Sequence, residues 1–173
     1  MKKIIFLLIF SIIYFFPINI YAANNPLLLI LKGEVILYTC GVAESEVNKY
    51  VKLGRYSTKD MQGKGAKSQS IPIPFALINC GPNRPVTITF NGTRDLVDNE
   101  LLKLTQDKSV AKNIAIEMQD AQRNRLPLGK KSGYISDSDG NVHTQFYAHY
   151  ITTEESPTPG KAKANATFLI EYE

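Results

Sequence analysis

Apolar and polar residues alternate with a period of two along most of the chain after residue 32, whereas long stripes with helical spacing are scarce. Because successive side chains of a strand point to opposite faces, this pattern predicts strands that each bury one face. The predicted strands cover residues 33–42, 51–54, 71–79, 86–90, 113–118, 125–128, 142–152 and 164–172. Short strands separated by turn residues predict an all-β fold, a β-sandwich.

The segments between the predicted strands carry turn chemistry, at Asn91-Gly92 and at residues 136–141 and 157–160. Pro72 and Pro74 place the start of strand 71–79 at a sheet edge, because proline has no N–H to donate. Residues 59–70, which are rich in Lys, Gly, Gln and Ser, predict a mobile loop. Leucines and acidic residues have helical spacing only at 95–104, which predicts about one or two helical turns.

The first residues have the layout of a secretory signal. Lys2 and Lys3 precede an apolar run over residues 4–16, and small residues follow at Ala22 and Ala23. A membrane-spanning helix needs about 20 apolar residues, and this run is interrupted by Pro17. We therefore expect residues 1–22 to be removed on export, the alternative being an uncleaved anchor. The remaining length suits one domain.

Charge and cysteine content narrow the class further. The formal net charge of +4 includes Lys2 and Lys3, so the exported part carries 18 basic and 16 acidic residues, a balance that does not indicate nucleic-acid binding. Cys40 and Cys80 both lie in the exported part, and an oxidising compartment predicts a disulfide between them. A metal site would require more ligands.

The exported chain begins with an unusually apolar segment, Leu-Leu-Leu-Ile-Leu at residues 27–31, with no chain before it to pack against. An immunoglobulin-like sandwich uses seven strands, and only about six strong ones are visible, so the final strand can face an unfilled place in its sheet. Lys32, Gly33 and Glu34 offer too little turn chemistry for the segment to fold back. Donation of this segment to a neighbouring molecule is the easier solution, and the alternative is a complete sandwich in which it is the domain's own first strand.

Several short motifs, taken in order, carry a resemblance to a known family. They are KGEV at 32–35, INC at 78–80, VTITFNG at 86–92, IAIE at 114–117, LPLG at 126–129, FYA at 146–148 and ANATFLIEY at 164–172. With a signal peptide, two cysteines and a tyrosine next to the last residue, the chain resembles a minor pilin, or adaptor subunit, of the chaperone-usher family that includes type 1 fimbriae.

The resemblance implies an incomplete immunoglobulin-like β-sandwich (pilin fold) that lacks its final strand and carries an N-terminal donor-strand extension. Residues 1–22 would be the signal peptide, 23–35 the extension and 36–173 the pilin domain. The implied partners are a periplasmic pilus chaperone, an outer-membrane usher and neighbouring pilin subunits, and the destination is the cell-surface fimbrium. The implied donor residues are Leu27, Leu29, Leu31, Gly33 and Val35. The implied acceptor-groove and chaperone-contact residues are Phe168, Ile170 and Tyr172.

The extension departs from the family pattern, because Leu28 and Ile30 are apolar as well and both faces of the strand are therefore apolar. A shift by one residue would exchange the inward and outward sets, which leaves the register open. Leu28 and Ile30 can instead cover a neighbour's surface.

The sequence shows no constellation typical of an enzyme. His143 and His149 have no carboxylate or nucleophile at an informative spacing. Asp137, Asp139 and Asn141 fit a plain turn better than a calcium loop. We expect a structural, non-catalytic subunit without a cofactor that polymerises by donor-strand exchange. The competing class is a self-contained exported sandwich or adhesin that binds a ligand, although a two-domain tip adhesin would be longer.

Overall fold

The computed structural model describes residue 33 and residues 37–44 and 47–172. The chain divides into one unit over residues 1–35, of which only Gly33 is described, and a second unit over residues 36–173. The described part of the second unit contains eight strands and no α-helix, so the all-β prediction is confirmed. The strands are β1 (Gly41–Val42), β2 (Ile71–Ile78), β3 (Pro85–Gly92), β4 (Leu102–Lys103), β5 (Ile114–Gln119), β6 (Lys131–Ile135), β7 (Val142–Thr152) and β8 (Ala166–Tyr172).

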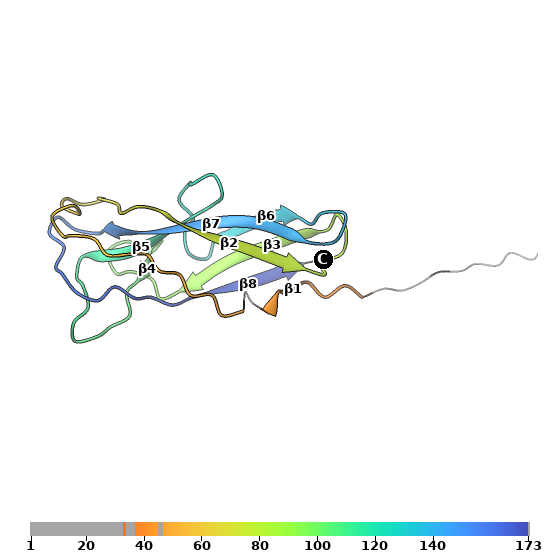
Figure 1. The fold of residues 1–173 in the computed structure, drawn as a ribbon, viewed down its shortest axis with the longest axis horizontal. Coiled ribbons are helices and arrows are strands. Elements are labelled where there is room, and N and C mark those ends of the chain that lie inside the picture. The colour runs from red at the N-terminus through yellow and green to blue at the C-terminus, as the bar shows by residue number, and fades with distance from the viewer. Residues whose placement is uncertain (1–32, 34–36, 45–46, 173) are drawn as a thin grey trace, which may run out of the picture. The chain divides into compact units, whose positions relative to one another are not determined.

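The strands form two antiparallel sheets that pack face to face (Figure 1). One sheet has the order β1-β2-β7-β5-β4, and the other has the order β6-β3-β8. Aromatic rings from both sheets meet in the core, where the ring centroids of Phe90 and Phe146 lie 4.7 Å apart and those of Phe75 and Phe146 lie 5.8 Å apart. The period-two pattern explains this core, since Val86, Ile88 and Phe90 of β3 are all buried.

Five predicted strands are confirmed, as β2, β3, β5, β7 and β8. The edge position of the prolines is also confirmed, because β1 pairs with β2 only at Leu77 and Ile78, and no other described strand lies on that side of the start of β2. Pro72 and Pro74 therefore cost the sheet no hydrogen bond on their free edge.

The predicted helical turns at 95–104 are wrong. Within this segment the backbone N–H groups of Val97 and Asp98 donate to the side chain of Asp95, which makes a turn, and the chain then enters β4. Leu101 and Leu102 are both buried, although they are adjacent, because they pack into two different core clusters. Leu96 is 85% exposed, so the leucine spacing does not mark one buried helical face.

Two further predicted strands are wrong over the residues that the structure describes. Only Gly41–Val42 of segment 33–42 forms a strand, and Leu37 is 86% exposed. Residues 51–54 form no strand and pair with none among the described residues. At residues 37–40 and 51–54, alternation did not come with a neighbouring strand among the described residues.

Turn predictions had mixed outcomes. The turn at 136–141 is confirmed, since Asp137 Oδ1 accepts the N–H groups of Asp139 and Asn141. Asn91-Gly92 is not a turn, because both residues belong to β3 and pair with Thr167 and Ala166 of β8. The predicted strand 125–128 is reduced to a single bridge between Gln119 and Arg125, whereas β6 was not anticipated.

Candidate functional site

The open edge of β8 is the candidate functional site. β8 pairs with β3 from Val86↔Tyr172 to Gly92↔Ala166, and among the described residues it has no partner on its other side. An unpaired edge presents backbone N–H and C=O groups that can bond another strand. The site therefore has the chemistry for adding a strand.

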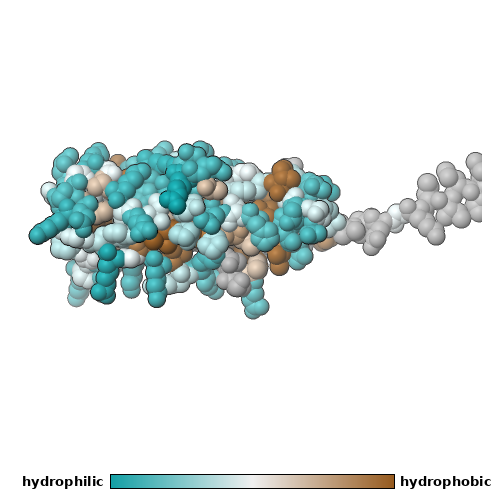
Figure 2. Space-filling view, turned by 45° about the horizontal axis from the view of Figure 1, so that its top comes forward, coloured by the Kyte–Doolittle hydropathy of each residue, from teal (hydrophilic) through white to brown (hydrophobic). Residues whose placement is uncertain are grey.

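The inward-facing side chains of β8 are only partly covered. Phe168 and Ile170 pack against the core but remain half-buried, and Tyr172 is 44% exposed. The ring of Phe168 meets that of Phe75 edge to face, with centroids 4.7 Å apart. Figure 2 shows that hydrophobic side chains reach the surface of this unit between hydrophilic ones. The predicted groove residues thus lie together on one strand, at the margin of the core.

Half-buried apolar residues from other segments continue this margin. We call the set the open apolar strip, and it is defined as Val51, Tyr150, Ala162, Ala164, Phe168 and Ile170, all of which pack against the core while staying partly exposed. The strip draws on β7, on β8 and on the segments before β2 and β8. Sequence reasoning identified only its β8 members, because the others come from segments that form no strand or belong to another sheet.

Tyr150 connects the two sides of the open apolar strip. Its hydroxyl donates to the carbonyl oxygen of Ala162, 3.0 Å away, on the segment before β8. Its ring contacts that of Tyr56, at a centroid distance of 6.1 Å, on the segment before β2. Burial raises the pKa of Tyr150, with nearby Tyr56 and Tyr50 adding to the effect. Two segments more than a hundred residues apart in sequence therefore lie on either side of one tyrosine.

The segment that carries Tyr56, residues 50–56, forms no strand in the described part of the chain. Val51 and Leu53 point into the core, whereas Tyr50 and Lys52 are exposed. Among the described residues, no backbone hydrogen bond joins residues 50–56 to a strand. Along residues 50–56 and along the outer edge of β8, the described backbone thus has free hydrogen-bonding capacity.

The predicted disulfide is confirmed, with an S–S distance of 2.04 Å between Cys40 and Cys80. It joins the residue before β1 to the chain just after β2, where the N–H of Cys80 also donates to the carbonyl oxygen of Gly140 at 2.8 Å. The bridge therefore secures the start of the domain to the five-stranded sheet.

The structure does not test the predicted donor residues. Leu27, Leu29, Leu31 and Val35 lie outside the described residues, and Gly33 is exposed. The donor register stays a prediction.

A buried charged cluster on the outer face of the five-stranded sheet was missed by sequence reasoning. Glu117, whose side chain is 2% exposed, accepts a hydrogen bond from Lys67 Nζ at 2.7 Å. His149 Nε2 lies 3.3 Å from Glu117 Oε1, Arg125 Nε lies 3.2 Å from Glu117 Oε2, and Ser70 Oγ lies 3.1 Å from His149 Nδ1. Glu117 and His149 meet only because they are paired across β5 and β7.

Burial alone would raise the pKa of the Glu117 carboxyl. The contacts with His149 and Lys67 outweigh that effect and lower the pKa to about 2. Glu117 is consequently an ion held by its neighbours, and its setting differs from that of a proton donor poised near neutral pH. His143, the other histidine, is exposed.

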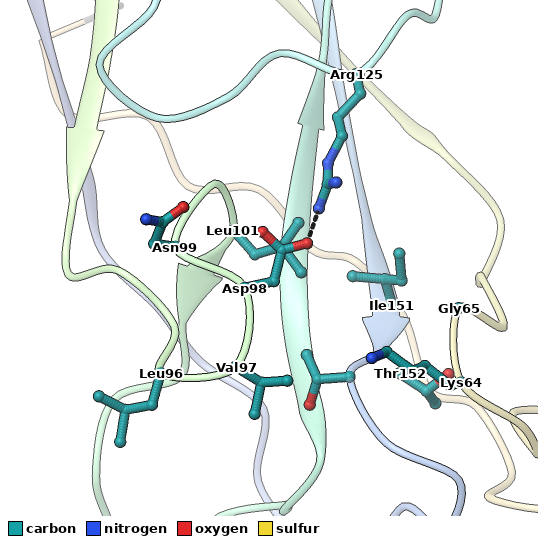
Figure 3. Close-up of a pocket in the computed structure, with 11 residues that line it drawn as sticks. Lys64, Gly65, Leu96, Val97, Asp98, Asn99, Leu101, Arg125, Ile151 and Thr152 are labelled. Atoms are coloured by element: carbon teal, nitrogen blue, oxygen red, sulfur yellow. Dashed lines mark hydrogen bonds and ion pairs between the residues drawn. The ribbon is translucent and has the colours of Figure 1, made fainter.

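A pocket of about 520 Å³ lies beside this cluster (Figure 3). Leu96, Val97 and Ile151 supply apolar lining, and Asp98 and Arg125 form an ion pair at its side. Arg125 also lies 3.2 Å from Glu100 Oε2, so its charge is already shared among carboxylates. The arrangement is that of an ion-pair network beside a pocket lined by both polar and apolar side chains.

Among the described residues, no group of three or more His, Cys, Asp or Glu side chains gathers in a way that could hold a metal ion. Within the same part of the chain, no helix is both long and apolar enough to cross a membrane.

Comparison with known proteins adds independent evidence. The family model described as "Fimbrial protein" matches residues 29–173. The fimbrial-like protein FimF of Salmonella typhimurium (strain LT2) is 38% identical over 143 residues, which cover 82% of this chain and 81% of that protein.

Fimbrial proteins with solved structures are also similar to this chain. An antigen and type I fimbria protein of Burkholderia pseudomallei is 25% identical, with a TM-score of 0.60 over 77% of this chain and 88% of that chain. The P pilus rod subunit PapA is 17% identical, with a TM-score of 0.63 over 78% of this chain and 99% of that chain. The second likeness is one of fold alone.

Proposed function

The chain belongs to the fimbrial protein family, and from this premise we propose how it is joined to its neighbours. It has the immunoglobulin-like pilin fold and is a structural subunit of a chaperone-usher fimbria at the cell surface. Our proposal is that the open edge of β8 accepts a strand from one neighbour, while residues 23–35 form the strand donated to another.

The observation that carries the proposal is the one-sided pairing of β8 above a half-buried apolar strip. A self-contained sandwich would cover this edge with a strand of the same molecule, and within the described residues β8 pairs with β3 alone. An added strand would bond to the free edge through its main chain and place alternate side chains over Phe168 and Ile170.

The energetics suit a lasting connection. Burial of four aliphatic side chains of the donated strand would contribute roughly 6 to 12 kcal/mol before the cost of ordering that strand is subtracted. Leu27, Leu29, Leu31 and Val35 are the four side chains that we assign to this role, with Gly33 at the close approach between them.

We further propose the path by which the subunit reaches the fimbria. Residues 1–22 direct export and are removed, and a periplasmic chaperone then covers the open apolar strip with a strand of its own. At the outer-membrane usher, the extension of the next subunit replaces the chaperone strand. Residues 36–173 are the pilin domain throughout.

Removal of residues 24–32 tests the donor assignment. The shortened chain should still bind its chaperone, because the open apolar strip is intact, but it should fail to attach to the subunit ahead of it. Co-purification with the chaperone and incorporation into isolated fimbriae are the two measurements.

A length-matched control replaces Leu27, Leu29 and Leu31 by serine, and it should behave like the deletion. Loss of chaperone binding with attachment preserved would reverse the assignment of the two ends.

A further inference from the structure

The borders of the open apolar strip are basic. Residues 47–59 contain Lys49, Lys52, Arg55 and Lys59 and no acidic residue. Residues 156–165 contain Lys161 and Lys163 and again no acidic residue. Tyr150 contacts both segments, so these charges border the same strip.

Alternation places several of these charges on the solvent side. Val51 and Leu53 face the core, and the intervening Lys52 is exposed. Ala162 and Ala164 likewise pack against the core. Lys161, just before Ala162, and Lys163, between the two alanines, are exposed. We define the basic rim as Lys52, Arg55, Lys161 and Lys163, all four of which are exposed.

Among the four residues of the basic rim, only Lys161 is engaged in an ion pair within the described part of the chain. Asp107 lies 3.3 Å from Lys161 Nζ, and Glu171 on β8 pairs with Lys131 of β6 at 2.8 Å. Glu171 is therefore engaged on the side of β8 that faces away from the strip. A strand lying in the strip would have its outward side chains in the same row as the basic rim, about 5 Å from those of its neighbours.

We infer that the basic rim selects a donor strand with acidic outward positions, and therefore a different subunit in preference to a copy of this chain. The inference rests on the proposed function. Opposite charges across a pairing surface speed association and exclude mismatched partners. In its own extension, residues 24–31 carry no carboxylate, and Lys32 balances Glu34. The chain's own extension therefore has the apolar inward residues, but it lacks the acidic outward residues that would pair with the basic rim.

Strand uptake by the chaperone-bound subunit tests the inference. Three peptides of residues 24–35 share Leu27, Leu29, Leu31, Gly33 and Val35. One has the natural sequence, one carries Leu28→Glu, Ile30→Glu and Lys32→Glu, and one carries Leu28→Lys and Ile30→Lys. At low salt the acidic peptide should be taken up about tenfold faster than the basic one, with the natural peptide between them. At about 1 M salt, where the Debye length is about 3 Å, the rates should converge.

Charge reversal in the subunit provides the matched comparison. The variant Lys52→Glu, Lys161→Glu, Lys163→Glu should reverse the preference between the acidic and basic peptides. The control variant Arg84→Glu, Lys130→Glu changes exposed basic residues next to β3 and β6, and it should keep the original preference.

The outcomes separate the two proposals. Equal uptake of acidic and basic peptides would overturn the inference and leave the acceptor role of β8 in place. An unchanged preference in the charge-reversed subunit would also overturn it, because the selecting charges would then lie elsewhere. If no peptide enters, the proposed function fails and the inference fails with it.

Discussion

Glu117 shows how one charged side chain can be kept inside a small domain. Its carboxylate lies on the outer face of β5 and is covered by the loop that carries Lys67 and by Arg125. Removing one member of a buried charged cluster leaves the other members without compensation, which costs more than the intact cluster contributes.

The substitution Glu117→Gln should therefore lower the free energy of unfolding by about 3 to 5 kcal/mol. Urea denaturation of the chain lacking residues 1–22 measures the effect. Glu100→Gln is the matched control, since Glu100 also contacts Arg125 but its side chain is 44% exposed, and it should cost less than about 1 kcal/mol. Equal losses for the two variants would contradict the role given to burial.

Acid should weaken the same cluster. The folded pKa of Glu117, about 2, lies below the ordinary value of 4.5, so the unfolded chain binds this proton more tightly. The stability that this group contributes is complete above pH 4.5 and is lost as the pH falls from 4.5 toward 2. Denaturation at a series of pH values should show this loss in the natural chain, and Glu117→Gln should remove most of it.

Gly92 is needed for a close approach between β3, β4 and the chain before β8. A Cβ at this position would meet the side chain of Leu102 and lie 3.1 Å from the carbonyl oxygen of Asn165. Gly92→Ala should cost about 1 to 3 kcal/mol of unfolding free energy by overpacking. Gly133→Ala in β6 of the same sheet has open space around the new atom and should change stability by less than 1 kcal/mol in the same urea assay.

At the scale of elements, β8 joins a structural face and a binding edge in one strand. Ile170 belongs to the open apolar strip, and its neighbour Leu169 points to the opposite face and is 52% exposed. The same substitution at Leu169 and at Ile170 should therefore affect chaperone binding differently.

Ile170→Asp should abolish co-purification with the chaperone, because it would bury an uncompensated carboxylate under the added strand. Leu169→Asp should leave co-purification within about twofold of the natural level, since the new carboxylate stays in solvent. Pull-down from periplasmic extracts measures both. Equal loss in the two variants would indicate that β8 is merely destabilised.

Alternation predicted the strands that have one buried face and a neighbour, such as β3 and β8, and their inward residues with them. It failed at the described residues 37–40 and at 51–54, because alternation reports where side chains lie and not whether the backbone has a partner. β6 was missed because Lys-Ser-Gly-Tyr-Ile carries little apolar alternation. The pairing of Glu117 with His149 was equally hidden, since it depends on the register between β5 and β7.

On the scale of the whole molecule, the proposed function makes the domain incomplete until a strand is supplied. A copy of residues 24–35 fused after Glu173 through a flexible linker could turn and run back along the free edge of β8. The melting temperature of the fused chain should be about 10 to 20 °C higher than that of the unfused chain. Each kcal/mol added to the free energy of unfolding raises the melting temperature by about 2 to 4 °C for a domain of this size.

Thermal unfolding followed by circular dichroism measures the shift, and gel filtration should show that the fused chain stays monomeric. A fusion with Leu27, Leu29 and Leu31 of the added copy replaced by serine is the control. A shift of the same size with that control would mean that the linker, and not the strand, had stabilised the domain.

Tyr150 lies where tyrosine fluorescence can report the binding of a strand. The chain has nine tyrosines and no tryptophan, so its ultraviolet emission comes from tyrosine alone. Because Tyr150 touches both borders of the strip, an arriving strand would cover a ring that now faces partly outward. Occupancy of the fimbrial subunit could thus be followed by intrinsic fluorescence, without attaching a dye.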